Sequence, residues 1–153
     1  MDFRPLTPED LPLVATWLAR AHVGEWWKGP IALEDGLAQF IAVLAGEPIG
    51  YLQSYQAAAC HGDGWWLEVT DPGVFGIDQF LAHPAALGQG VGTRMVRAFV
   101  GRIFEDPHVT RVQADPAPEN ARAIRCYEKA GFRRLRTIVT PDGPAEYMVR
   151  DRA

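Results

Sequence analysis

The sequence predicts an α/β (α+β) fold with a mixed, mostly antiparallel central sheet that is flanked by helices. Two observations carry this prediction. Apolar segments joined by tight turns occur in both halves of the chain. Between them lies a strand–helix–strand–helix run, with a glycine-rich turn between its first strand and first helix. This order differs from the regular alternation of a doubly wound fold. The 153 residues and a hydrophobic content of 48% suit one domain, residues 1–153, with one core.

The first half of the chain predicts an opening strand, a helix and a hairpin. Residues 7–10 form a helix start, with a capping hydroxyl, proline at the first helical position and two acids in the first turn. Apolar residues follow at helical spacing, namely Leu11, Val14, Ala15 and Leu18. Residues 23–30 are expected to be irregular. The hairpin is expected to have its two strands and its turn at residues 40–44, 49–55 and 45–48.

The second half predicts further strands and two helices. Strands are expected at residues 65–69 and 75–81, and a helix after the glycines of residues 88–92. The apolar residues of this helix recur at helical spacing and predict one buried stripe, namely Val91, Met95, Val96, Phe99, Val100 and Ile103. A strand, a second helix closed by Gly131, and a final hairpin are then expected at residues 109–114, 119–130, 132–140 and 145–150.

Composition excludes several classes of protein. The net charge of −4 argues against nucleic-acid binding, and no stretch approaches the roughly 20 apolar residues that span a bilayer. Cys60 and Cys126 lack the spacing of a zinc site or a disulfide framework and indicate a cytoplasmic protein with reduced thiols. The four histidines show no metal-ligand spacing, so no metal is expected.

A glycine-rich turn is the first candidate for a binding site. Residues 87–93 read Leu-Gly-Gln-Gly-Val-Gly-Thr and lie between a predicted strand and a predicted helix. Glycines let the backbone approach a ligand closely, and the free N–H groups at a helix start bind anions. The glycines are spaced GxGxG and come late in the chain, so a dinucleotide-binding fold is disfavoured. On this motif alone, a plain turn remains the alternative.

With a second motif, the chain resembles the GCN5-related N-acetyltransferase (GNAT) superfamily. Gly90 and Gly92 match the superfamily's coenzyme motif Q/R-x-x-G-x-G/A, although Leu87 stands where Gln or Arg is usual. Residues 119–132, with Asn120, Tyr127 and a terminal Gly-Phe, match a second helix of that superfamily.

The resemblance extends nearly end to end to the aminoglycoside 6′-N-acetyltransferases, which are antibiotic-resistance enzymes. It is carried by motifs such as Gly-Asp-Gly-Trp-Trp at residues 62–66 and Thr-Pro-Asp-Gly-Pro-Ala at 140–145. One departure is a short connection from Trp27 to Phe40, where that family usually carries a longer helical segment beside the acceptor pocket.

The resemblance implies an acetyl-coenzyme A-dependent N-acetyltransferase and gives roles to several residues. Asp78 is the implied general base for the amine, and Tyr127 the implied acid for the leaving thiolate. The coenzyme is expected to bind the backbone near the end of the preceding strand, the glycine turn and the second helix, at Phe80, Leu81, Gln89, Gly90, Val91, Gly92, Thr93 and Asn120.

The resemblance implies that the acceptor is a small-molecule amine, namely an aminoglycoside antibiotic that is acetylated at its 6′-amino group. Asp71, Asp115 and Asp142 match acceptor-binding acids of the aminoglycoside enzymes, and with Asp78 they are expected to converge, ionised, on a polycation. Trp26, Trp27, Trp65 and Trp66 are candidates for a wall on which sugars stack, although tryptophans also serve in the core.

Other functions stay open at this point. The acceptor is alternatively a polyamine, a siderophore precursor or a protein N-terminus, and a chain without turnover would be an acetyl-coenzyme A-binding module. The presence of both Asp78 and Tyr127 favours an enzyme. We expect a monomer or a homodimer without nucleic-acid or membrane partners.

Overall fold

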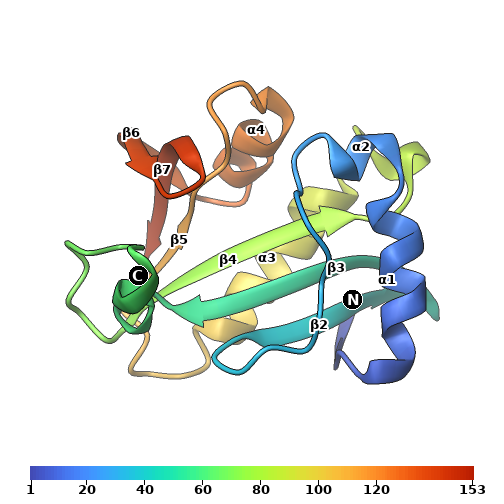
Figure 1. The fold of residues 1–153 in the computed structure, drawn as a ribbon, viewed down its shortest axis with the longest axis horizontal. Helices are drawn as coiled ribbons and strands as arrows, with labels where there is room; N and C mark the ends of the chain where they lie inside the picture. The colour runs from blue at the N-terminus through green and yellow to red at the C-terminus, as the bar shows by residue number, and fades with distance from the viewer.

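The computed structural model describes all 153 residues and contains one seven-stranded sheet with helices on both faces (Figure 1). The strand order is β1-β2-β3-β4-β5-β7-β6, and all neighbours are antiparallel except β4 and β5. The predicted mixed, mostly antiparallel sheet is confirmed. The strands are β1 Asp2–Pro5, β2 Ala38–Leu44, β3 Glu47–Gln56, β4 Val74–Leu81, β5 Arg111–Ala114, β6 Arg133–Thr140 and β7 Gly143–Asp151.

Four α-helices and three 3-10 turns occupy the connections. Their bounds are η1 Pro8–Asp10, α1 Leu11–Leu18, α2 Ala21–Gly24, η2 Ala57–Asp63, η3 Pro84–Ala86, α3 Val91–Ile103 and α4 Ala121–Lys129. The predicted start at Thr7 is confirmed, because its backbone N–H donates to Asp10 Oδ2 over 2.9 Å and its hydroxyl over 3.1 Å. The segment 23–30, expected to be irregular, instead begins inside the short helix α2.

The strand predicted at residues 65–69 is wrong. This segment is a loop that follows η2, and Trp66 has a φ of 55°, which no strand residue adopts. Its ring lies 5.7 Å from the ring of Tyr147 on β7. The apolar pattern of the segment therefore reflects side-chain packing against the last hairpin, whereas a strand would pair its backbone.

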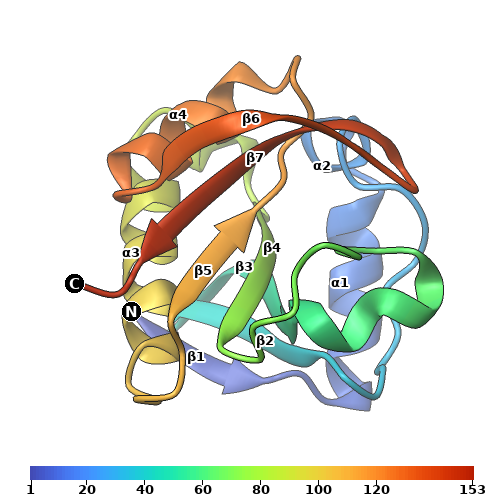
Figure 2. The same ribbon diagram turned by 90° about the vertical axis from the view of Figure 1, so that its left-hand side faces the viewer.

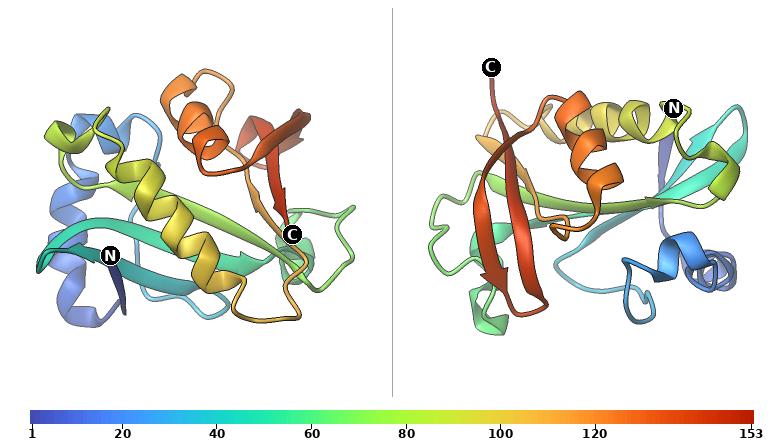
Figure 3. Two further views of the ribbon diagram at one scale, coloured as in Figure 1. Left: turned by 180° about the vertical axis from the view of Figure 1, so that it is seen from behind. Right: turned by 90° about the horizontal axis from the view of Figure 1, so that it is seen from above.

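The two faces of the sheet carry separate cores. The right-hand view of Figure 3 shows the sheet between α3 and α4 on one side and α1 and α2 on the other. On β3, Leu52 packs toward α3 while its neighbour Tyr51 packs toward α1, because successive strand residues point to opposite faces. The predicted apolar stripe of α3 is buried at Met95, Val96, Phe99 and Val100.

The sheet opens between β4 and β5. The two parallel strands pair only from Val74 to Gly76, opposite Arg111 to Gln113. Beyond that point β4 continues to Leu81, whereas β5 ends at Ala114 and the strands diverge (Figure 1). Pro116 and Pro118 follow β5, and proline has no N–H to donate to a sheet. β7 pairs with the other side of β5, and β6 lies outside it (Figure 2).

Candidate active site

An open cleft of about 790 Å³ lies where β4 and β5 diverge. Its walls come from α2 and the residues after it, the end of β4, the glycine turn, the connector after β5 and α4. The divergence exposes one edge of β4 from Ile77 to Leu81, since β5 pairs with β4 no further than Gly76. Segments that are far apart in the sequence thus meet at the open edge of one strand.

The glycine turn forms one end of this cleft. Gly88 and Gly90 have φ angles of 76° and 78°, which glycine adopts without strain. A Cβ atom at either position would meet no atom within 4 Å, so both glycines border open space. Gly90 is the N-cap of α3, and the predicted residues Gln89 to Thr93 therefore surround the positive end of a 13-residue helix. This end of the cleft suits a phosphate group.

Three cations of α4 line the same cleft, and the sequence interpretation gave them no role. Arg122, Arg125 and Lys129 are three and four residues apart, so they lie on one face of the helix. The spacing was available in the sequence, but only the fold turns this face toward the glycine turn. Asn120 also lines the cleft, and its side-chain oxygen caps α4 by accepting the N–H of Ala123 over 3.2 Å.

The end of β4 offers backbone groups to the cleft. Ala82 donates its N–H to Ile49 of β3, and peptide groups of successive residues point in opposite directions along a strand. Leu81 therefore directs its N–H and C=O toward the open edge, while Phe80 faces β3. The carbonyl of Leu81 is already occupied, because the Nε2 atom of His22 lies 2.8 Å from it. The Leu81 N–H remains as a donor that faces the cleft.

Asp78 lies on the same edge and is partly buried. Burial raises the pKa of its carboxyl, a hydrogen bond from Gln53 opposes that rise, and the charge of Asp142 adds to it. The Nε2 atom of Gln53 donates to Asp78 Oδ2 over 3.0 Å. A carboxylate with a raised pKa is a stronger base than an exposed one.

Asp115 and Asp142 converge with Asp78. Asp115 follows β5 and lines the cleft, and Asp142 lies in the turn between β6 and β7. Burial, Asp78 and Asp142 together raise the pKa of Asp115 well above its usual value. Asp115 shares the cleft lining with Asp78, and Asp142 is near enough for its charge to act on both. The raised pKa values of Asp78 and Asp115 run against the expectation that all of these acids are ionised in the free protein, because neighbouring negative charges oppose one another.

Asp71 lies apart from these three acids. It precedes β4 at the end of the sheet where β4 and β5 remain paired, and it does not line the cleft. Its carboxylate accepts the Thr110 hydroxyl over 2.7 Å and the Gly73 N–H over 2.8 Å. Asp71 therefore joins two loops, although the resemblance to the aminoglycoside enzymes implied that it binds the acceptor.

Tyr127 projects from α4 into the cleft and is 5% exposed. Burial raises the pKa of its hydroxyl far above the usual value, the charge of Asp78 adds to the rise, and the side chain of Gln79 opposes it. The hydroxyl therefore keeps its proton at neutral pH. Gln79, which the sequence interpretation did not single out, lies on β4 between Asp78 and the backbone donors.

Residues 7–140 match the family described as an acetyltransferase (GNAT) domain. The chain belongs to the GNAT superfamily. The type 1 aminoglycoside N(6′)-acetyltransferase of Klebsiella pneumoniae is 51% identical over 165 residues, covering 97% of this chain and 82% of that protein.

Two solved structures resemble this GNAT domain throughout. An aminoglycoside acetyltransferase in complex with coenzyme A and kanamycin has a TM-score of 0.93 and 52% identity, covering 98% of this chain and 94% of that one. A second, with paromomycin and acetyl-coenzyme A, has a TM-score of 0.93 and 51% identity, covering 98% and 92%. The predictions of an acetyl-coenzyme A-dependent N-acetyltransferase and of its co-substrate are confirmed.

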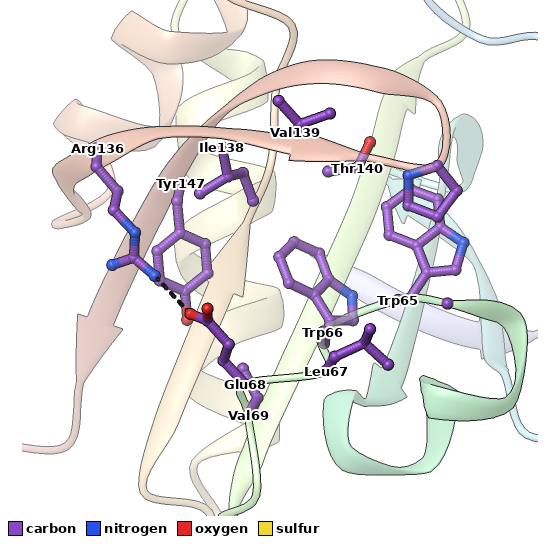
Figure 4. Close-up of a pocket in the computed structure, with 12 residues that line it drawn as sticks. Trp65, Trp66, Leu67, Glu68, Val69, Arg136, Ile138, Val139, Thr140 and Tyr147 are labelled. Atoms are coloured by element: carbon purple, nitrogen blue, oxygen red, sulfur yellow. Dashed lines mark ion pairs between the residues drawn. The ribbon is translucent and has the colours of Figure 1, made fainter.

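The tryptophans divide between two places in this GNAT domain. Trp26, 41% exposed, and Trp27 line the cleft. Trp65 and Trp66 instead line a separate pocket of about 360 Å³ between the 64–69 loop and the β6–β7 hairpin (Figure 4). There the Arg136 guanidinium lies 3.8 Å from Glu68, as the dashed line marks. The four residues therefore do not form one wall.

Two further features bear on partners of this GNAT domain. No group of three or more His, Cys, Asp or Glu side chains is arranged to hold a metal ion. None of its helices combines the length and the apolar character needed to cross a membrane.

Proposed function

We propose that this GNAT domain transfers the acetyl group of acetyl-coenzyme A to the 6′-amino group of an aminoglycoside such as kanamycin or tobramycin. The position of Asp78 and Asp115 in the lining of one cleft, with the charge of Asp142 acting on both, carries this proposal. Three crowded carboxylates are unfavourable alone and favourable around a polycation, whose ammonium groups neutralise them. The relatives named above that act on or bind aminoglycosides support the same acceptor.

The proton transfers are assigned to Asp78 and Tyr127. Asp78 takes a proton from the acceptor's ammonium group, directly or through a water, and the neutral amine then attacks the thioester carbonyl. The Leu81 N–H stabilises the oxygen of the tetrahedral intermediate. When this intermediate collapses, the carbon–sulfur bond breaks and Tyr127 donates its hydroxyl proton to the leaving thiolate. The attacking nitrogen loses its surplus proton, which restores the Tyr127 hydroxyl through water, and Asp78 releases its proton to solvent. The products are an acetamide and coenzyme A.

The coenzyme is assigned to the glycine turn and α4. The N–H groups from Gln89 to Thr93 hold the pyrophosphate at the start of α3. Arg122 and Arg125 add positive charge from the facing helix. Asn120, at the start of α4, lines the same cleft as the glycine turn and Tyr127, and its side chain is assigned to the pantetheine arm.

The acceptor is assigned to the opposite side of Asp78. Asp115 and Asp142 bind ammonium groups of the acceptor, and Trp26 offers an apolar face for a sugar ring. Because these contacts are charge-assisted, we expect the KM for the acceptor to rise with salt. Asp71 has no part in this site.

A direct test is turnover of acetyl-coenzyme A with kanamycin, tobramycin, spermidine and a short peptide, followed by mass spectrometry of the product. Asp78→Asn should lower kcat by about 100-fold or more, the usual contribution of a general base. A matched acceptor with a hydroxyl in place of the 6′-amine should not be acetylated. Acetylation of spermidine or the peptide alone would keep the enzyme class and replace the acceptor. Expression in a susceptible bacterium provides the cellular counterpart, where unchanged growth inhibition would contradict the proposal.

A further inference from the structure

A continuous chain of hydrogen bonds connects Asp78 to the loop that precedes β2. Gln53 Nε2 donates to Asp78 Oδ2 over 3.0 Å, and the Tyr51 hydroxyl donates to Gln53 Oε1 over 2.7 Å. Gln39 Nε2 donates in turn to the Tyr51 hydroxyl over 3.0 Å. The three bonds cross β4, β3 and β2, which are neighbours in the sheet.

The loop before β2 fixes the orientation of the Gln39 amide. The carbonyl of Ala32 accepts a hydrogen from Gln39 Nε2 over 2.8 Å, and the Glu34 N–H donates to Gln39 Oε1 over 3.1 Å. If the Gln39 amide were flipped, its oxygen would face the Ala32 carbonyl oxygen and its nitrogen would face the Glu34 N–H. Gln39 is only 8% exposed, so water has little access to repair such a flip.

The direction of donation then passes along the chain. The Tyr51 oxygen receives a hydrogen from Gln39, so its own proton points to Gln53 Oε1. Burial raises the pKa of Tyr51 to about 12, against a smaller lowering by Gln39, and the charges of Asp78 and Glu34 add to the rise. The hydroxyl therefore keeps its proton, and Gln53 is left with its amide N–H groups toward Asp78.

Asp78 has few other groups that favour its charged form. The titratable groups that respond to it or act on it are all acids or weak acids, namely Asp115, Asp142, Tyr51, Tyr55, Cys60 and Tyr127. The carboxylates among them oppose a negative charge on Asp78. Gln53 is the neighbour that donates a hydrogen bond to the carboxylate, and this bond favours the ionised base.

We infer that Gln39, Tyr51 and Gln53 are positioning residues that keep a hydrogen-bond donor on Asp78, with their orientation set by the loop at Ala32 and Glu34. This inference rests on the proposed role of Asp78 as the general base. The loop belongs to the short connection between Trp27 and Phe40, and the Trp27 ring packs edge-on to Tyr51 at 5.6 Å. The segment that follows Trp27, itself a cleft residue, thus holds the far end of the hydrogen-bond chain to the base.

The direct test is Gln53→Leu, which removes the donor and keeps an apolar side chain of similar length. The acid limb of the pH profile of kcat/KM for kanamycin should move upward by about one pH unit, because Asp78 is then protonated at higher pH. Thermal unfolding of the same sample shows whether the variant is folded. A folded Gln53→Leu enzyme with an unmoved acid limb would overturn the inference.

Two substitutions at Gln39 test whether the direction of hydrogen donation matters, apart from the loss of the side chain. In Gln39→Glu, the new carboxylate accepts a hydrogen bond from the Tyr51 hydroxyl, so Gln53 Oε1 loses its donor. The Gln53 amide is then less fixed, and its hydrogen bond to Asp78 weakens. The acid limb should move upward. Gln39→Leu removes the donor to Tyr51 but adds no competing acceptor, so Tyr51 can still donate to Gln53 and the acid limb should move less than in Gln39→Glu. Equal pH profiles for the two variants would contradict the inference.

A double mutant distinguishes the chain from a direct effect of the new charge. If Gln39→Glu acts through Gln53, its upward shift should disappear in a Gln53→Leu background. A shift of the same size in both backgrounds would mean that the new charge acts on Asp78 directly, and it would refute transmission through the hydrogen-bond chain. Asp78→Asn tests the premise that Asp78 is the base. High residual turnover of Asp78→Asn would contradict that role. A large loss of turnover in Asp78→Asn, together with an unchanged acid limb in Gln53→Leu, would contradict only the role of the positioning residues.

Discussion

Thr110 donates its hydroxyl hydrogen to Oδ2 of Asp71 over 2.7 Å and thereby joins the residues that precede β5 and β4. The Thr110 N–H adds a bond to the Gly73 carbonyl over 2.8 Å. These contacts lie at the end where the two strands pair, and the strands diverge at the other end. The closed end therefore fixes the position from which the cleft opens.

The first prediction concerns Asp71. Asp71→Ala should lower the Tm and leave the KM for kanamycin near that of the parent, whereas Asp142→Ala should raise this KM. The Thr110 hydroxyl and the Gly73 N–H lower the pKa of Asp71, so its contribution is present at neutral pH and is lost as the pH falls. The difference in Tm between parent and Asp71→Ala should accordingly shrink in acid. A raised KM for kanamycin with an unchanged Tm would instead mean that Asp71 binds the acceptor.

The second prediction concerns the coenzyme. Gly90→Glu should greatly weaken acetyl-coenzyme A binding in calorimetry, because it places a carboxylate and a strained backbone at the anion site of α3. Gly101→Glu is a matched control, since it makes the same change on the same helix, where a Cβ meets no atom within 4 Å. The control should bind normally. Equal affinity of Gly90→Glu and the parent would place the pyrophosphate elsewhere.

The third prediction concerns Tyr127. Tyr127→Phe should lower kcat less than Asp78→Asn does, because a thiolate with a pKa of about 8.5 leaves tolerably without protonation. The affinity for acetyl-coenzyme A should change little, as the ring remains to pack against Phe132. Steady-state kinetics with calorimetry separate these effects. A loss confined to coenzyme affinity would make Tyr127 a binding residue.

The fourth prediction is that Asp115 aids acceptor binding but lowers the stability of the folded protein at high pH. Burial and the neighbouring carboxylates raise its pKa in the folded chain, so its ionisation opposes folding as the pH rises through that value. Asp115→Asn should therefore raise the Tm at pH 8 and have less effect at pH 4, while it raises the KM for kanamycin. Thermal unfolding at both pH values tests the first part. A lower Tm at pH 8 would mean that Asp115 has a stabilising partner.

Much of the fold followed from local pattern. The spacing of Met95, Val96, Phe99 and Val100 predicted one buried stripe, and α3 buries it. The turn residues at 45–48 and 141–144 predicted two hairpins, and both pairs of strands are antiparallel. The loop at residues 65–69 was read as a strand because two tryptophans and a valine are also common in strands.

The candidate site was predictable where one segment makes it. The glycine turn is a local feature, since Gly90 caps α3 by its own backbone conformation. The role of Arg122 and Arg125 depends on which face of α4 meets the cleft, and the helical period alone leaves that face undetermined. Asp71 shared a family pattern with Asp115 and Asp142, yet it lies at the opposite end of the β4–β5 pair.

The sequence by itself identified the superfamily through the resemblance of its motifs. It also predicted most of the strands and helices and the glycine turn, because glycine conformations, caps and apolar periods act within a few residues. Tertiary structure alone decided which side chains share an environment. It joined Gln39, Tyr51, Gln53 and Asp78 across three strands and separated Trp65 from Trp26. The physical reason is that hydrogen-bond partners and charge neighbours are set by strand register and by the divergence of β4 from β5, neither of which leaves a local mark in the sequence.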